Sequence, residues 1–418
     1  MPADDLSQRL ASVLDRGDAV ELLQGAIRRE SITGNETNFV AFLEEEMRAR
    51  GIGNLRRTDF LPGRSNIRGE RKGAGGGKRL LFIGHTDTVH VNGWREHWTG
   101  TEREDPFGGA VIDGSIWGRG AGDLKAGICS ALAALSLLDR ARIRLKGDVA
   151  FAFVGDEESG EPDTGVSAGV KAYIAEIEAG IVPKPDFTVY VEPTQLAVFT
   201  AQIGFFIADI VITGKSAYFG VPELGKDALK ASHAVMSALW RHSDEITTRA
   251  RHSLIGEGFL LITGLSGGGF IAVPGECKLS LIRKLLPGES LDEAAREMET
   301  VIRGAIADPE IRVDISYPAG RDHPLGGSAA EIDRTLPEVA LLARSVADAM
   351  PARGQIKGAP FWSESPFFVN RLGIPAVYCA PGDISNCHTV EEHVEVEEYL
   401  AGVVAFAAFM ARYCGAVD

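Results

Sequence analysis

Short apolar runs alternate with longer amphipathic stretches through the first half of this chain. The runs LLFIG (80–84), DVAFAFVG (148–155) and FTVYVE (187–192) have the length of strands, and GICSALAALSLLDRA (127–141) has the length of a buried helix. Strands that are apolar on both faces and alternate with helices are typical of a sheet covered on both sides. The pattern predicts an α/β domain with its chemistry at the carboxyl ends of the strands.

The segment before the first run, up to about Glu70, is expected to be helical. AVELLQGAIRRE and NETNFVAFLEEEMRARG place apolar residues three and four positions apart, and Gly51 is expected to end the second helix. The following KGAGGGKR (72–79) lacks a GK[ST] ending and does not stand between a strand and a helix. We therefore interpret it as a flexible hairpin loop and not as a phosphate-binding loop.

The pattern changes at about Ile203. FFIADIVITG, KDALKASHAVMSALWRH, GFLLITGL, ECKLSLIRKL, LDEAAREMETVIRGAI and IRVDISY follow in a strand, helix, strand, strand, helix, strand order. That order is typical of a ferredoxin-like α+β unit. After Pro318 the α/β pattern resumes, ending in a helix over EEYLAGVVAFAAFMARY. We expect a discontinuous catalytic domain, residues 1–202 and 319–418, interrupted by a separate domain at 203–318.

Composition narrows the possible functions. The length of 418 residues favours two domains, and 45% apolar with 24% charged residues is ordinary for a globular enzyme. The formal net charge of −15 argues against binding to nucleic acid or to an anionic membrane. The N-terminus lacks the apolar core of a signal peptide, and five scattered cysteines form no CxxC pair. A cytoplasmic location is the expectation.

Seven histidines and carboxylates stand at or near the ends of apolar segments: His85, Asp87, Asp123, Glu157, Glu158, Glu192 and His388. Each has an ordinary alternative by itself. Asp123 could cap the helix that follows it, the acids at 156–158 could form a solvated loop, and His388 could be a polar histidine of the core. Three consecutive acids at the end of a buried strand would repel one another unless cations were present. Taken together, the segments predict a metal-dependent hydrolase.

The order GHTDTV, GRGAGDLKAG, GDEESGE, YVEPT and CHTVEEHVEV resembles one family of metallohydrolases over nearly the whole chain. The family includes zinc-dependent aminoacylases, acetylornithine deacetylases, succinyl-diaminopimelate desuccinylases and glutamate carboxypeptidases. The resemblance implies a mixed-sheet, metallopeptidase-like catalytic domain with an inserted lid and dimerisation domain.

The resemblance also implies roles for the residues of the motifs. One metal would be bound by His85, Asp123 and Glu192, and the other by Asp123, Glu158 and His388. Asp87 would orient His85. Glu157 would be the general base that takes a proton from the attacking water and returns it to the leaving nitrogen. One or two ions of zinc, cobalt or manganese suit the mixed nitrogen and oxygen donors.

The chain departs from the family pattern at several positions that bear on the substrate. Tyr218 stands where the lid usually has a histidine, Ile271 where asparagine is common, and Ser363-Glu364 where a Ser/Thr-Asp pair is usual. Tyr218 could instead be a strand-end aromatic residue. Trp362 and the phenylalanines around it could belong to the core or line a pocket for a flat ring.

Arg283 matches the lid arginine that binds the substrate carboxylate in similar enzymes, although it could also be a charge at an exposed strand edge. The family default is a deacylase for an N-acyl amino acid, a small carboxylate-bearing substrate. The alternative is an aminohydrolase that releases ammonia from an activated aromatic amine such as a nitroanthranilate. A homodimer or larger homo-oligomer formed through the lid is expected, with no nucleic-acid or membrane partner.

Overall fold

The computed structural model describes residues 3–158 and 164–417, which form two compact units. The larger unit comprises Met1–Thr200, Ile332–Gly358 and Phe367–Asp418, and the smaller comprises Ala201–Glu331 and Ala359–Pro366. Residues 201–202, 319–331 and 359–366 therefore belong to the smaller unit, whereas the pattern of apolar residues predicts bounds of 203 and 318. Residues 159–161 of the GDEESGE motif lie outside the described residues.

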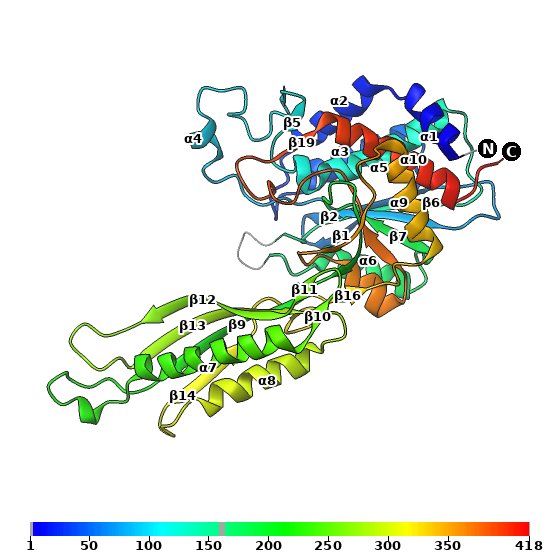
Figure 1. Ribbon diagram of the computed structural model, residues 1–418. Coiled ribbons are helices and arrows are strands. Elements are labelled where there is room, and N and C mark those ends of the chain that lie inside the picture. The colour runs from blue at the N-terminus through cyan, green and yellow to red at the C-terminus, as the bar shows by residue number, and fades with distance from the viewer. Residues whose placement is uncertain (1–2, 159–163, 418) are drawn as a thin grey trace. The chain divides into compact units, whose positions relative to one another are not determined.

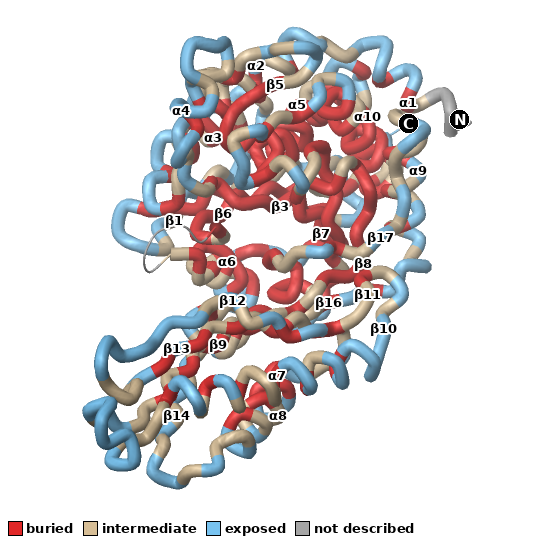
Figure 2. Tube along the Cα trace, turned by 60° about the vertical axis from the view of Figure 1, so that its left-hand side comes forward, coloured by how far each residue is buried: buried red, intermediate tan, exposed pale blue. Residues whose placement is uncertain are grey.

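A mixed sheet forms the centre of the larger unit, and its strands follow the order β1-β2-β6-β3-β7-β18-β8-β16, with β17 paired to β8. β16 and the last two residues of β8 are counted with the smaller unit. The strands are β1 (Gly53–Leu61), β2 (Arg64–Arg71), β3 (Leu80–His85), β6 (Val149–Val154), β7 (Phe187–Tyr190), β8 (Val198–Gln202), β16 (Ala330–Glu331), β17 (Ile356–Ala359) and β18 (Ala376–Tyr378). The three predicted strands β3, β6 and β7 are adjacent, parallel and buried throughout (Figure 2). The predicted α/β fold with a mixed sheet is confirmed.

Helices cover both faces of this sheet (Figure 1). On one face lie α2 (Arg16–Ile27), α3 (Thr37–Ala49), α5 (Ala126–Arg140) and α10 (Val396–Tyr413), and on the other lies α6 (Ala168–Glu178). The remaining helices of this unit are α1 (Ala3–Ser12), α4 (Trp94–Trp98) and α9 (Pro337–Ala349). The apolar stretch Ala121–Arg140 has the length and composition of a membrane span, but it is 94% buried inside the protein, as the central helix of a core is.

The expectation of helix up to Glu70 is wrong after α3, because residues 53–71 form the antiparallel pair β1 and β2. β1 is largely exposed and carries few apolar residues, so its sequence has no clear period of two. The predicted loop at 72–79 is present, but it does not close a hairpin, because β2 and β3 each pair with β6 between them. Gly77 lies in this loop against backbone, where a Cβ would come within 2.2 Å of the Cys414 carbonyl oxygen.

The smaller unit contains the predicted strand and helix order. Its sheet follows β12-β13-β9-β14, with β15 also paired to β9, and all of its pairings are antiparallel. The elements are β9 (Gly204–Thr213), α7 (Ala228–Arg249), β12 (Phe259–Gly267), β13 (Glu276–Leu285), α8 (Leu291–Gly304), β14 (Arg312–Ser316) and β15 (Gly326–Gly327). Inward-facing residues of β9 and β13, among them Ile210 and Leu281, form one core with α7 and α8.

Candidate metal centre

Neighbouring strands of the larger unit place polar side chains at one edge of the sheet. His85 is the last residue of β3, Glu157 and Glu158 follow β6, and Glu192 stands two residues beyond β7. Because these strands are parallel, their carboxyl ends meet at the same edge. His85, Glu158 and Glu192 are buried, although unpaired charges are costly to bury.

Asp123 joins the two halves of this cluster. It lies in η1 (Ala121–Lys125), where its φ of −115° and ψ of 93° are not helical, just before α5 begins. One carboxylate oxygen, Oδ1, lies 3.0 Å from Nε2 of His85, and the other, Oδ2, lies 3.1 Å from Nε2 of His388. Asp123 therefore does not cap α5; its two oxygens face two different histidines.

Each histidine has a further carboxylate beside it. Nε2 of His388 is 2.8 Å from Oε1 of Glu158, and Nε2 of His85 is 3.8 Å from Oε1 of Glu192. The donor atoms of His85, Asp123 and Glu192 lie within 4.8 Å of one another, and so do those of Asp123, Glu158 and His388. These are the two sets that the family resemblance implied. His85, Glu157 and Glu158 form a third group within the same distance.

The carboxylates of the cluster favour positive charge on the two histidines. Hydrogen bonds to Asp123 and Glu158 raise the pKa of His388 to about 11. Burial lowers the pKa of His85, but the hydrogen bond to Asp123 and the negative charge of Glu192 leave it well above its usual range. Protons on the histidines or divalent cations would supply the missing charge. Two imidazoles with several carboxylates are a donor set that suits zinc, cobalt or manganese, so the residues fit such ions.

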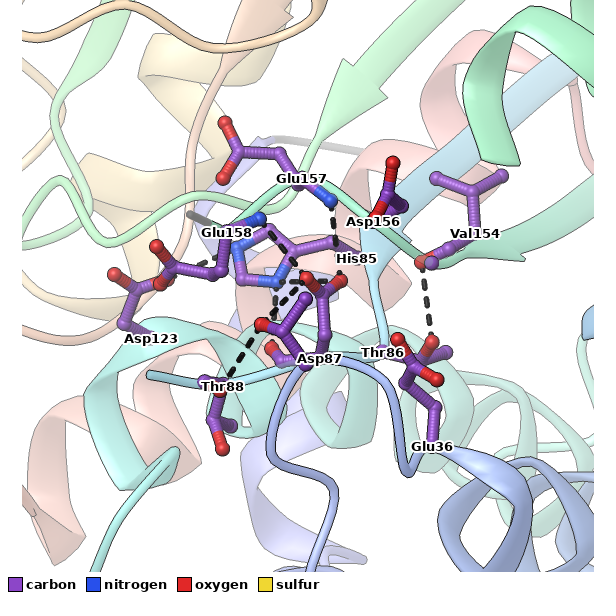
Figure 3. A network of polar contacts seen from close by, with 12 residues as sticks. Glu36, His85, Thr86, Asp87, Thr88, Asp123, Val154, Asp156, Glu157 and Glu158 are labelled. Atoms are coloured by element: carbon purple, nitrogen blue, oxygen red, sulfur yellow. Dashed lines mark hydrogen bonds and ion pairs between the residues drawn. The ribbon is translucent and has the colours of Figure 1, made fainter. Parts of the chain in front are cut away.

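Asp87 contacts its neighbours through both its backbone carbonyl and its carboxylate (Figure 3). Nδ1 of His85 is 2.9 Å from the backbone carbonyl of Asp87 but 3.9 Å from its carboxylate. The carboxylate instead accepts hydrogen bonds from the backbone N–H of Glu157 at 3.3 Å and of Glu158 at 2.9 Å, and from the Thr33 hydroxyl at 3.1 Å. Asp87 thus contacts His85 through its main chain, and its side chain holds the segment that carries Glu157.

Two buried arginines with acidic partners, which the sequence did not point to, lie beside these residues. Arg119 pairs with Glu392, which is four residues beyond His388. Arg64 pairs with both Glu36 and Asp156, the residue before Glu157. The only signal in the sequence was that an arginine precedes Asp123 within GRGAGD and an acid follows His388 within CHTVEEHVEV.

Tyr218 and Ile271 lie together in the smaller unit. Tyr218 forms a bridge with Ala272, its ring packs on Phe219 at 4.6 Å, and the Phe219 N–H reaches the Ile271 carbonyl at 3.4 Å. More than half of the surface of Tyr218 and of Ile271 is exposed. Two of the departures from the family pattern therefore share one exposed place.

Arg283 is buried on β13, an interior strand of its sheet, so an exposed strand-edge charge is the wrong interpretation. Its guanidinium contacts Glu289 at 2.6 Å. Burial lowers the pKa of Arg283, and the charge of Glu289 opposes that change. A substrate carboxylate would compete with Glu289 for this guanidinium.

In the smaller unit, Trp362 is partly buried and Ser363 is buried. The Trp362 indole N–H donates to the Ser328 carbonyl at 3.1 Å, and its ring meets Phe205 edge to face. Ser363 is buried, and its carbonyl accepts from the Gln202 side chain at 3.0 Å. The neighbouring Phe367 and Phe368 are core residues of the larger unit.

Curated relatives match the chain over most of its length. It is 28% identical over 415 residues to a succinyl-diaminopimelate desuccinylase of Gluconacetobacter diazotrophicus, covering 95% of this chain and 97% of the relative. It is 25% identical over 364 residues to an acetylornithine deacetylase of Myxococcus xanthus, covering 84% of each. A 40% identical match to a succinyl-diaminopimelate desuccinylase of Methylorubrum extorquens covers 139 residues, 33% of this chain and 35% of that protein.

Solved structures share the fold. An M20 metallo-carboxypeptidase from Sulfolobus solfataricus superposes with a TM-score of 0.75 at 16% identity, covering 95% of this chain and 99% of that one. A dinuclear metal-binding M20 peptidase from Bacillus subtilis has a TM-score of 0.65 at 15% identity and covers 95% and 98%. The model of peptidase family M20/M25/M40 matches residues 81–412. The chain therefore belongs to this family and is a metal-dependent hydrolase of carbon–nitrogen bonds.

Proposed function

We propose that this enzyme is a deacylase that cleaves the amide bond of a small N-acyl amino acid at a two-metal site. The observation that carries the proposal is the position of Asp123, whose two oxygens lie about equally far from His85 and His388. A carboxylate placed in this way can bridge two cations a few ångströms apart.

His85, Asp123 and Glu192 would hold one ion, and Asp123, Glu158 and His388 the other. Divalent cations, when bound, supply Lewis-acid activation of water and of the amide carbonyl. Five residues of the centre are buried, namely His85, Asp87, Asp123, Glu158 and Glu192. Half of the His388 side chain is exposed, which leaves that side of the site open to solvent.

Glu157 is the proposed general base. One of its carboxylate oxygens lies within 4.8 Å of donor atoms of His85 and Glu158, close enough to act on a water at the same site. Asp87 holds the Glu157 and Glu158 amides and so limits how far the base can move. Glu157 would take the proton from the attacking water and deliver it to the departing nitrogen.

The substrate class rests on the relatives. Acetylornithine deacetylase and succinyl-diaminopimelate desuccinylase are named for removing acyl groups from amino acids. We propose the same class here, with Tyr218 and Ile271 as substrate contacts that replace a histidine and an asparagine. Arg283 would bind a substrate carboxylate only by exchanging Glu289 for it. The aromatic-amine alternative gains no support from these relatives.

A substrate panel tests the proposal. Protein loaded separately with zinc, cobalt and manganese is assayed for carboxylate release from N-acetyl, N-formyl and N-succinyl amino acids, and for ammonia release from aromatic amines. We expect release of the acyl group and its loss on exhaustive chelation. Ammonia release alone, or turnover that persists after chelation, would contradict the proposal.

Two variants separate the base from the ligands. Glu157→Gln should lower kcat by roughly 10²–10⁴-fold, the usual contribution of a general base, and leave the metal content unchanged. Asp123→Asn should lower the metal content as well, because it weakens the ligand that the two sites share. A Glu157→Gln enzyme with normal turnover would exclude Glu157 as the base.

We also propose that the smaller unit forms a homodimer. β12 is an edge strand of its sheet, and its Phe259, Leu261 and Leu265 are exposed, so both its backbone and its apolar side chains are available to a second copy. A cytoplasmic location remains a prediction from composition.

A further inference from the structure

Glu392 is a carboxylate buried completely at the side of the candidate metal centre. Its Oε1 accepts hydrogen bonds from the backbone N–H groups of Gly122 and Asp123, both at 3.1 Å. Its Oε2 accepts from a guanidinium N–H of Arg119. The Glu392 side chain is therefore hydrogen-bonded to the main chain at Asp123, whereas Glu392 itself lies four residues after His388 in the sequence.

Arg119, the partner of Glu392, is also buried and hydrogen-bonded. Its side chain is 3% exposed, and its Nε donates to the His90 carbonyl at 3.2 Å. Its backbone N–H donates to the Pro106 carbonyl at 2.7 Å, and the preceding Gly118 N–H donates to the Glu392 carbonyl at 3.2 Å. Side chains and main chain thus join the two segments that carry Asp123 and His388.

Glu392 binds a segment of the backbone that lacks the regular hydrogen bonds of a helix. Asp123 has non-helical φ and ψ, so the amides of Gly122 and Asp123 are served by Glu392 and not by a helix ladder. His388 adopts a φ of 62°, which non-glycine residues rarely take without support from their surroundings. Both proposed ligands therefore depend on their supports for their orientation.

We propose that Glu392, held by Arg119, is a positioning residue that sets the separation of Asp123 and His388 and thereby controls metal affinity. This inference rests on the proposed metal site, but it concerns a residue that is not a ligand. Residues that orient metal ligands typically contribute about 10–100-fold to metal affinity. A pair that served only to stabilise the fold would leave the affinity of the folded protein unchanged.

The test is the variant Glu392→Gln, with metal binding measured directly. Glutamine keeps one oxygen for the two amides but turns an NH₂ group, which cannot accept, toward the Arg119 guanidinium. Apo-protein is titrated with zinc or manganese in competition with a chromogenic chelator, so that no substrate enters the measurement. We expect about 10–100-fold weaker binding than in the unaltered protein.

The neighbouring Glu391 offers a matched control. Its side chain is half exposed and lies 3.4 Å from His97, so Glu391→Gln makes the same chemical change one residue away without touching Asp123. This variant should bind metal with unchanged affinity. Equal affinities for Glu391→Gln and Glu392→Gln would overturn the proposal.

Arg119→Lys provides a second measurement if Glu392→Gln fails to fold. Lysine keeps the charge but cannot contact Glu392 and the His90 carbonyl with a rigid fork, so metal affinity should fall here too. A lowered melting temperature of the apo-protein with unchanged metal affinity would show a structural role only and overturn the proposal. Normal metal binding by the unaltered protein without amide hydrolysis would instead refute the proposed function and leave the positioning role standing.

Discussion

Arg64 holds two buried carboxylates next to the proposed general base, and its replacement is a quantitative test of the structure. Its guanidinium donates to Glu36 through Nε at 3.1 Å and to Asp156 through Nη1 at 2.9 Å. The side chains of Glu36 and Asp156 are completely buried, and that of Arg64 is 11% exposed. Arg64→Met keeps most of the aliphatic volume of the side chain. It removes the positive charge that compensates the negative charges of both Glu36 and Asp156.

The expected loss of unfolding free energy depends on the hydrogen-bond donors that each acid retains in the variant. Asp156 retains three backbone donors, the N–H groups of Gly165, Val166 and Ala168 at 3.1–3.2 Å, so it remains partly solvated by the chain. Glu36 retains the Gly34 N–H at 3.1 Å. Removing one partner from a buried pair typically costs about 3–5 kcal/mol, and we expect the free energy of unfolding of the larger unit to fall by that amount.

Urea unfolding followed by tryptophan fluorescence measures this change. Replacing Trp240 and Trp362 by phenylalanine leaves three tryptophans, all in the larger unit, as reporters. The surface variant Arg16→Met is the control, because Arg16 and its partner Glu397 are more than half exposed and such pairs contribute about 0–1 kcal/mol.

A second substitution tests whether the cost comes from an uncompensated charge. Glu36→Gln introduced into the Arg64→Met protein removes the negative charge and should recover part of the lost stability. A loss of unfolding free energy for Arg64→Met as small as that for Arg16→Met would refute the reasoning. In that case Glu36 and Asp156 would have to be protonated or hydrated in the folded variant.

Two further predictions concern pH and assembly. Burial raises the pKa of Glu70 and of Asp148, but hydrogen bonds from Arg79 and Lys72, among others, leave both below their ordinary values. Their stabilisation is therefore present above pH about 4–5, the ordinary range of such carboxyls, and is lost as the pH falls through the lowered values. The stability difference between the unaltered protein and Arg79→Gln, measured by thermal melting, should shrink in acid; a difference that grows would be inconsistent with this sign. Leu261→Lys with Leu265→Lys should convert the proposed dimer to a monomer in light scattering at micromolar concentration, and a monomeric unaltered protein would disprove the dimer.

The apolar pattern was sufficient for the elements that are buried on every side. β3, β6, β7 and α5 appeared as continuous apolar runs because each is surrounded by protein, and their polar ends marked His85, Glu157, Glu158 and Glu192. Exposed strands do not appear as continuous apolar runs in the sequence. The sequence of β1, which is mostly in contact with solvent, therefore does not distinguish it from a helix.

The partners of the polar side chains were decided only by the tertiary structure. Arg119 and Glu392 are 273 residues apart, and Arg64 and Asp156 are 92 apart. The type and spacing of residues restrict which ones can bind a metal, because imidazole and carboxylate chemistry is local to each side chain. Which carboxylate meets which amide or guanidinium depends on how distant segments pack, as the side chain of Asp87 at the Glu157 amide and the burial of Arg283 against Glu289 illustrate.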